Sequence, residues 1–347
     1  MPISSNQDFF IQWHLTERCN LHCAHCYQTG ERTEELSFRE MRELLTEVAD
    51  MIDDWTSLYG LSLSSSFTLT GGEPFLREDL PLILEELGKS EFEIYLLSNG
   101  TLIDREKAGM LAGWKVRGVQ VSMEGPEQIH DKIRGNGSFA ASVRGVRLLL
   151  DAGLTVTLNA TISTINADHF MDMVSVASSL GVQKLGFSRL VPSGRGMGML
   201  DTMLPEAKVQ ELYSKIFSLK TDGLTIVTGD PIAWQTTDTP GKDAGDTPSG
   251  GCAAGVSGLT ILPDGTVTPC RRLPIPLGNV RTDSLREIWA SSPVLEALRD
   301  RSSYNGKCGR CSKWALCRGC RAIAYACSQM EGGNDFLADD PQCFIKV

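Results

Sequence analysis

The sequence FIQWHLTERCNLHCAHC, at residues 10–26, joins a largely apolar run to three closely spaced cysteines. A short apolar run of this kind is typical of a buried strand, so Cys19, Cys23 and Cys26 are expected in the loop that follows it. Five more such runs occur in the first two hundred residues, separated by stretches with helical spacing. This alternation predicts a parallel sheet wrapped by helices. The six expected strands cover residues 10–15, 67–70, 94–97, 118–122, 155–161 and 184–188.

The expected helices are marked by their apolar spacing and by their ends. Ser37 and Glu40 form a capping-box pattern ahead of apolar residues at helical spacing. Asp79, Ser138 and Asn166 are the expected starts of three more helices, which end near residues 88, 153 and 181. Six strand-helix units are fewer than the eight of a closed barrel. The expected fold class is therefore α/β, with a partial (β/α)6 TIM-like barrel whose working face lies at the C-terminal strand ends.

The rest of the chain predicts a smaller second domain. Residues 206–219 have the pattern of one more helix, and residues 236–251, rich in Thr, Asp, Gly and Pro, predict a linker or mobile loop. A Pro-Asp-Gly turn within residues 259–268 predicts a β-hairpin. The expected division is a barrel core at residues 1–205, a helix and linker at residues 206–250, and a small cysteine-rich α+β domain at residues 251–347.

Composition and charge exclude several classes of protein. The 347 residues include 41% hydrophobic residues, enough for a large core, and the formal net charge is −10 without a long basic run. A nucleic-acid partner is therefore not expected. The sequence has neither a secretion signal at its start nor a long apolar span, which predicts a cytoplasmic protein without a membrane contact. In that compartment the 11 cysteines, an odd number, are expected as metal ligands rather than disulfides.

The three N-terminal cysteines have the spacing of an unusual iron-sulfur site. Three thiolates can hold three irons of a 4Fe-4S cluster and leave the fourth iron open to a small chelating molecule. A structural zinc ion is the alternative, but such a site takes four protein ligands and no fourth cysteine lies near.

Further polar motifs follow the next predicted strands. Gly71, Gly72, Glu73 and Pro74 come after the second strand. Ser98 and Asn99 follow the third strand, Ser122 and Glu124 the fourth, and Arg189 the sixth. With the C-x3-C-x2-C spacing of the cysteines, this order resembles the radical S-adenosylmethionine superfamily. The resemblance implies an enzyme that binds a 4Fe-4S cluster and S-adenosylmethionine.

The resemblance also implies roles for these residues. The Gly-Gly-Glu-Pro turn would bind the methionine amino group, and Ser122 and Arg189 would contact its carboxylate or the ribose. Asn99 would lie close by, and His25 would pack near the adenine. Many relatives have Asp in place of Glu124, which leaves the role of this carboxylate open. Asp131 and Arg134 match a further family pattern or form a solvated ion pair.

The C-terminal cysteines resemble the SPASM extension, which binds one or two auxiliary 4Fe-4S clusters. By this resemblance one cluster would be held by Cys308, Cys311, Cys317 and Cys343. Most of the other would be held by Cys252, Cys270 and Cys320, while Cys327 would be a ligand or a core thiol. Zinc bound by the four cysteines at residues 308, 311, 317 and 320 remains the alternative.

The resemblance implies reductive cleavage of S-adenosylmethionine to a 5′-deoxyadenosyl radical that abstracts a substrate hydrogen. The expected substrate is a ribosomally made peptide or protein. The alternative substrate is a haem, tetrapyrrole or other cofactor precursor. The second alternative is that the protein is not an enzyme and serves as an iron-sulfur scaffold or electron carrier. An external electron donor such as flavodoxin or ferredoxin is the expected partner.

Overall fold

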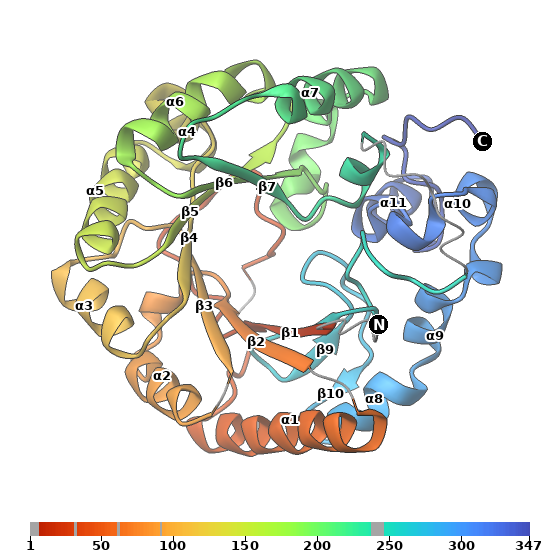
Figure 1. Ribbon diagram of the computed structural model, residues 1–347, viewed down its shortest axis with the longest axis horizontal. Helices are drawn as coiled ribbons and strands as arrows, with labels where there is room; N and C mark the ends of the chain where they lie inside the picture. Colours follow the sequence, from red (N-terminus) through yellow and green to blue (C-terminus); the bar gives the residue numbers. More distant parts are fainter. Residues whose placement is uncertain (1–6, 31–32, 61–62, 91, 237–245) are drawn as a thin grey trace.

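The fold is an open barrel of parallel strands with helices around its outside (Figure 1). A computed structural model describes residues 7–30, 33–60, 63–90, 92–236 and 246–347. Neighbouring strands from the first to the seventh pair in parallel in the order of the chain, which confirms the predicted sheet. These strands are β1 (Gln7–His14), β2 (Leu63–Thr70), β3 (Glu93–Ser98), β4 (Gly118–Ser122), β5 (Val156–Ile162), β6 (Lys184–Arg189) and β7 (Thr225–Thr228).

Two features of the sheet were not expected. Strand β7, only four residues long, adds a seventh parallel strand beyond the six that the sequence predicts. The predicted C-terminal hairpin is present as β8 (Gly258–Ile261) and β9 (Thr266–Thr268), followed by β10 (Gly278–Asn279), and β8 pairs in parallel with β1. A Cβ at Gly258 would lie 2.4 Å from the Phe10 carbonyl oxygen, so this close pairing requires glycine. The C-terminal region therefore extends the barrel sheet itself.

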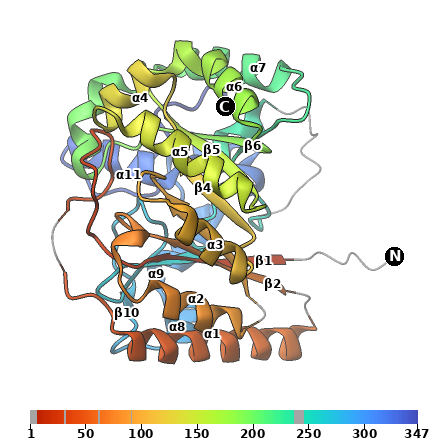
Figure 2. The same cartoon turned by 90° about the vertical axis from the view of Figure 1, so that its left-hand side faces the viewer.

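The helices form a layer outside the strands and close one side of the barrel. Figure 2 shows α1 and α2 packed against β1 and β2, with the loop after β1 beyond the strand ends. Figure 1 shows α9 to α11 on the side of the barrel between β7 and the hairpin strands, while α8 lies beside α1. The barrel helices are α1 (Phe38–Tyr59), α2 (Leu80–Gly88), α3 (Arg105–Gly113), α4 (Glu127–Arg134), α5 (Ser138–Asp151), α6 (Phe170–Leu180) and α7 (Glu206–Ser218). The later helices are α8 (Leu285–Ser291), α9 (Pro293–Arg299), α10 (Gly306–Arg310) and α11 (Arg321–Met330).

The predicted helices begin at or close to the predicted residues, but only one of the predicted side-chain caps is formed. The capping box of Ser37 and Glu40 is present at α1. Helix α5 is instead capped by Asp131, which accepts hydrogen bonds from the backbone N–H groups of residues 137 and 139. Asn166 does not cap α6, because its side chain donates to the carbonyl of Glu124. The Asp79 side chain makes no cap hydrogen bond and pairs with Arg77.

One hydrophobic core joins the barrel to the C-terminal region. Trp13 and Phe67 from the barrel and Leu285 and Leu295 from the C-terminal helices belong to the same buried cluster. Part of the predicted linker, residues 237–245, lies outside the described residues. The chain on its far side is docked, because the N–H groups of residues 249 and 250 donate to the Ala315 carbonyl. Among the described helices, none is long and apolar enough to cross a membrane.

Candidate cluster and cofactor site

The three N-terminal cysteines line a cavity of about 130 Å³ at the C-terminal ends of the strands. The cavity wall also includes His25, Gly71, Gly72, Ser98, Asn99 and Ser122, so most of the residues predicted for the site converge. N–H groups point at two of the sulfur atoms. The Leu21 N–H lies 3.5 Å from Cys19 Sγ, and Arg134 Nη1 lies 3.6 Å from Cys23 Sγ. Such donors stabilise thiolates, so the site fits the ligand chemistry of an iron-sulfur cluster.

Two glycines allow the loop after β2 to lie against the cysteine loop. The Gly72 N–H donates to the Thr16 carbonyl at 2.7 Å. A Cβ at Gly71 would lie 2.4 Å from that same oxygen, and one at Gly72 would lie 2.1 Å from the Arg18 carbonyl oxygen. Both contacts are far shorter than any carbon-oxygen van der Waals distance. Glycine is therefore required here, and it leaves backbone rather than side chains on the cavity wall.

Glu73 and Pro74 lie behind the cavity wall rather than on it. The carboxylate of Glu73 is fully buried and accepts hydrogen bonds from Ser98 Oγ and the Asn99 N–H, both at 2.9 Å. Asn99 in turn donates to Asn20 and points at Cys19 Sγ at 3.9 Å. In this structure Glu73 orients the loop after β3. The expected binding of the methionine amino group by the Gly-Gly-Glu-Pro turn stays a prediction.

Glu73 gives this site a testable pH dependence. Burial raises the pKa of its carboxyl group to about 7, although the hydrogen bonds oppose the shift. Below pH 4.5 both the folded and unfolded chains carry this proton. Between pH 4.5 and 7 the unfolded chain loses it first, so the free energy of unfolding should fall by up to about 3 kcal/mol.

Glu73→Gln cannot ionise and should lack this fall. Urea unfolding of the cluster-free protein at pH 5 and pH 8 measures this change in the free energy of unfolding. Glu78 is exposed, so Glu78→Gln is the control. Identical pH profiles for wild type and Glu73→Gln would contradict the expectation.

A buried charge group supports the other side of the cavity. Glu124 is fully buried, and its carboxylate lies 2.5 Å from Arg134 Nη2 and 3.3 Å from His25 Nε2. Burial alone would raise the pKa of Glu124, but Arg134 and His25 hold it well below its ordinary value. The carboxylate also accepts from the Thr161 N–H. Glu124 therefore fixes Arg134 and His25 on the wall, and Arg134 pairs with it rather than with Asp131.

Arg189 lies away from the cofactor cavity, contrary to the expectation that it contacts S-adenosylmethionine. Its side chain is 1% exposed and forms ion pairs with Asp230 at 2.7 Å and with Asp340 at 2.8 Å. A further bond runs from Nη1 to Gln342 at 2.8 Å. These contacts use all five N–H donors of the guanidinium. Arg189 thus joins β6 to the C-terminal loop and has no donor left for a cofactor.

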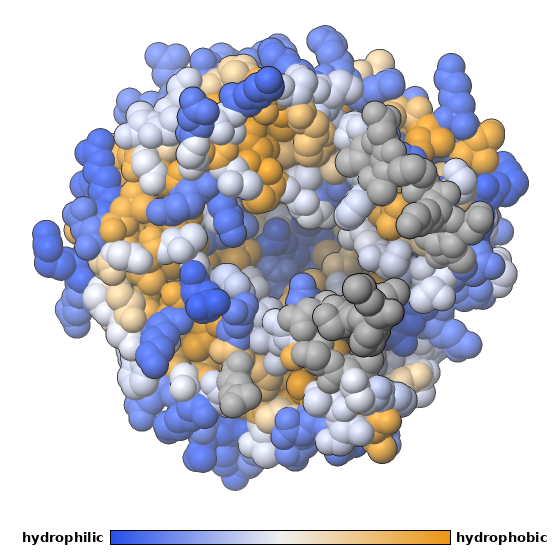
Figure 3. Space-filling view, viewed as in Figure 1, coloured by the Kyte–Doolittle hydropathy of each residue, from blue (hydrophilic) through white to orange (hydrophobic). Residues whose placement is uncertain are grey.

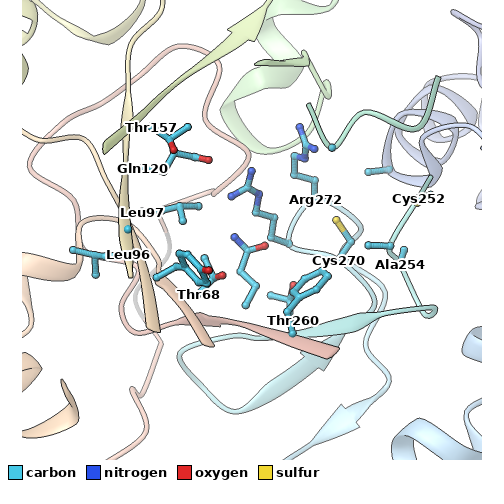
Figure 4. Close-up of a pocket in the computed structure, with 18 of the residues that line it drawn as sticks. Thr68, Leu96, Leu97, Gln120, Thr157, Cys252, Ala254, Thr260, Cys270 and Arg272 are labelled. Atoms are coloured by element: carbon cyan, nitrogen blue, oxygen red, sulfur yellow. The ribbon is translucent and has the colours of Figure 1, made fainter. Parts of the chain in front are cut away.

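The C-terminal cysteines separate into two groups. Three of them line a larger cavity of about 700 Å³ inside the barrel. Figure 4 shows two of these, Cys252 and Cys270, on the same side of that cavity as Arg272. Four others line a second, smaller cavity. The first group is Cys252, Cys270 and Cys320, and the second is Cys308, Cys311, Cys317 and Cys343.

N–H donors surround the second group, as they do the first site. Gln235 Nε2 lies 3.5 Å from Cys317 Sγ and 3.3 Å from Cys343 Sγ. The Lys313 N–H points at Cys311 Sγ at 3.4 Å. These donors fit a cluster held by thiolates. The remaining thiol, Cys327, lies on α11 in an apolar cluster and on neither cavity wall.

Comparison with known proteins agrees with this arrangement. A model of the radical SAM superfamily matches residues 13–177, and a model of the SPASM iron-sulfur cluster-binding domain matches residues 252–321. The chain is 30% identical over 350 residues to an AdoMet-dependent heme synthase of Nitratidesulfovibrio vulgaris, covering 97% of this chain and 92% of that protein. It therefore belongs to the radical SAM superfamily, and it is a member with a SPASM domain. It is an enzyme rather than a non-enzymatic iron-sulfur carrier.

Other relatives and structures are similar over most of the chain. The mycofactocin maturase MftC of Mycolicibacterium smegmatis is 29% identical over 346 residues, which is 96% of this chain and 82% of that protein. The crystal structure of Streptococcus suis SuiB bound to S-adenosylmethionine superposes with a TM-score of 0.75 at 16% identity, over 98% of this chain and 78% of that chain. The second comparison supports the fold alone. The cofactors of this enzyme are thus S-adenosylmethionine and 4Fe-4S clusters in both regions.

Proposed function

We propose that this radical SAM enzyme modifies a ribosomally synthesised peptide. The observation that supports the proposal is the cavity of about 700 Å³, which adjoins the cofactor cavity and has cysteines of the auxiliary region on its wall. Figure 3 shows a hollow at the centre of the barrel face with hydrophilic residues at its floor. A peptide segment entering this hollow would meet the cofactor at one end and an auxiliary cluster at the side. SuiB has been crystallised with its precursor peptide SuiA, and this chain has the same fold.

The chain's own residues have distinct roles in this proposal. Cys19, Cys23 and Cys26 hold the cluster that, with S-adenosylmethionine bound, supplies one-electron cleavage of the sulfonium. Backbone groups of Gly71 and Gly72 bind the methionine end of the cofactor. Four further wall residues, Ser98, Asn99, Ser122 and His25, orient the cofactor.

The auxiliary region completes the proposed reaction path. The group formed by Cys308, Cys311, Cys317 and Cys343 holds one auxiliary cluster, and Cys252, Cys270 and Cys320 hold most of a second. Cys252, Cys270 and Cys320 face the substrate cavity, so a cluster that they held would supply one-electron redox chemistry beside the substrate. An external flavodoxin or ferredoxin in the cytoplasm would reduce the first cluster. Cys327 is a candidate for the fourth ligand of the second cluster.

Modification of a tetrapyrrole is the second candidate. The observation that favours it is the similarity to heme synthases over nearly the whole chain. A cavity of this volume also accommodates a small cofactor precursor.

The test uses anaerobically reconstituted enzyme with dithionite and S-adenosylmethionine. One arm receives synthetic peptides encoded by any short reading frame found beside the gene, and the other receives an iron tetrapyrrole with propionate groups. We expect 5′-deoxyadenosine in both arms and a mass change, measured by mass spectrometry, in the peptide alone. A mass change in the tetrapyrrole alone would favour the second candidate. Absence of 5′-deoxyadenosine with intact clusters would overturn both.

A further inference from the structure

We propose that Arg271 and Arg272 form a binding site for a carboxylate of the substrate. This inference rests on the proposed function, because it concerns the same cavity. The two arginines directly follow Cys270 and lie on the walls of both the cofactor cavity and the larger barrel cavity. Only Leu97 and Gln120 share this property among the residues that line the two cavities. A ligand held by the arginines would therefore sit where the two spaces meet.

The larger cavity is positively charged in an otherwise acidic protein. Four basic side chains line it, those of Arg117, Lys184, Arg271 and Arg272, and no Asp or Glu is among its described lining residues. Arg117 pairs with Glu93 at 3.1 Å at the N-terminal strand ends. The net charge of the whole chain is −10. A low-dielectric cavity lined by one sign of charge concentrates ligands of the opposite sign, so the expected ligand is an anion.

The two arginines have few partners within the described part of the protein. The guanidinium of Arg271 lies 5.7 Å from the ring centroid of Tyr27, and no carboxylate among the described residues pairs with it. Arg272 reaches Ser188 Oγ and the Arg189 carbonyl only at 3.5 Å, and its buried Nε has no hydrogen-bond partner. Enclosing a guanidinium without a counter-charge is costly, so two adjacent ones indicate a missing anionic partner.

Other enclosed arginines of the chain have partners for their N–H groups. Arg318 and Arg321 donate to backbone carbonyl oxygens, and two more arginines have carboxylates. Arg189 has two carboxylates that occupy its donors, and Arg134 has Glu124. A guanidinium presents two parallel N–H groups that match the two oxygens of a carboxylate. A peptide offers such a group at its C-terminus or in an Asp or Glu side chain, and a tetrapyrrole offers it in a propionate. Figure 4 shows Arg272 across the cavity from Gln120 and Thr157.

Two other anions could neutralise the guanidinium groups of Arg271 and Arg272, and each predicts a different experimental result. The carboxylate of S-adenosylmethionine would make the arginines part of the cofactor site. Thiolates at Cys270 and Cys320 would make them counter-charges of an auxiliary cluster. Under the substrate proposal, neither the affinity for S-adenosylmethionine nor the potential of the auxiliary cluster depends on them strongly.

The experiment measures equilibrium binding of substrate to the unreduced holoenzyme with S-adenosylmethionine present. In Arg271→Gln and Arg272→Gln the substrate Kd should rise roughly 10- to 100-fold, the usual effect of losing a hydrogen bond between charged groups. The lysine variants should restore part of the affinity. Arg144→Gln, on the exposed face of α5, removes the same charge and should leave the Kd within twofold of wild type.

Substrate analogues identify which carboxylate is bound. The arms are a peptide amidated at its C-terminus, a peptide with Asp and Glu replaced by Asn and Gln, and a tetrapyrrole with esterified propionates. The analogue that lacks the recognised carboxylate should bind wild type weakly and be insensitive to Arg271→Gln.

Two results would overturn the proposal: an unchanged substrate Kd, with or without a shifted auxiliary potential, or a weakened affinity for S-adenosylmethionine. If no peptide binds or reacts, the proposed function fails, while the tetrapyrrole arm still tests the arginines. Circular dichroism and iron content show whether each variant is folded and loaded.

Discussion

Cys26→Ala should abolish the formation of 5′-deoxyadenosine. The cavity at the strand ends has three thiols and no spare one, so the variant should fail to hold the N-terminal cluster. Because the reaction depends on electron transfer from that cluster, the rate is expected to fall more than about a thousandfold. The measurement is the yield of 5′-deoxyadenosine with dithionite, together with iron content and the electron paramagnetic resonance signal of each cluster.

The same loop offers a control for this variant. His22 is exposed and lies outside the cofactor cavity wall, so His22→Ala should retain its iron and its activity. The auxiliary cluster signals should persist in Cys26→Ala, because those cysteines lie in separate cavities. Formation of 5′-deoxyadenosine by Cys26→Ala at the wild-type rate would show that another ligand holds the cluster.

Asp340→Asn should destabilise the protein strongly. Asp340 is fully buried, accepts two bonds from Arg189, and also accepts the Cys320 N–H at 2.8 Å. Burial alone would raise the pKa of Asp340, but Arg189 holds it below its ordinary value. Replacing this carboxylate leaves part of the charge of Arg189 uncompensated, at a cost of about 3 kcal/mol. The thermal midpoint under anaerobic conditions should fall by about 5–10 °C.

A surface aspartate provides the comparison. Asp222 is exposed before β7, and Asp222→Asn should leave the thermal midpoint unchanged. Arg189→Met with both acidic partners replaced by apolar residues should recover much of the loss, because no unpaired charge then remains. An unchanged midpoint in Asp340→Asn would show that the ion pairs contribute little to the stability of the fold.

Most of the barrel follows from local sequence patterns. Apolar runs separated by helical spacing predict six strands, and all six are present. Strand β7 is missed because its sequence TIVT is too short to show a period. The hairpin at β8 and β9 is predicted from its turn, but its parallel pairing with β1 is not. A turn motif reports which residues fold back on each other, and it carries no information about which distant edge the hairpin joins.

At the site, too, local motifs are predicted from the sequence, whereas contacts between residues far apart in the chain are not. The motifs at the strand ends predict which residues meet, since parallel strands end on one face. They do not predict that Arg189 forms ion pairs with Asp230 and Asp340, which lie 41 and 151 residues further along the chain. The sequence analysis also did not predict a site at Arg271 and Arg272. Two adjacent basic residues directly after a cysteine, in a short and otherwise apolar segment, are the pattern that would have marked them.

The pairing of β8 with β1 determines whether the N-terminal part of the chain can fold as a separate fragment. Strand β1 lies inside the sheet, between β2 and β8. A fragment that ended after α7 would leave one side of β1 with unpaired N–H and C=O groups beside the apolar surface of Trp13 and Ile11. Exposed edges of this kind promote aggregation. The catalytic half is therefore not expected to be an autonomous folding unit.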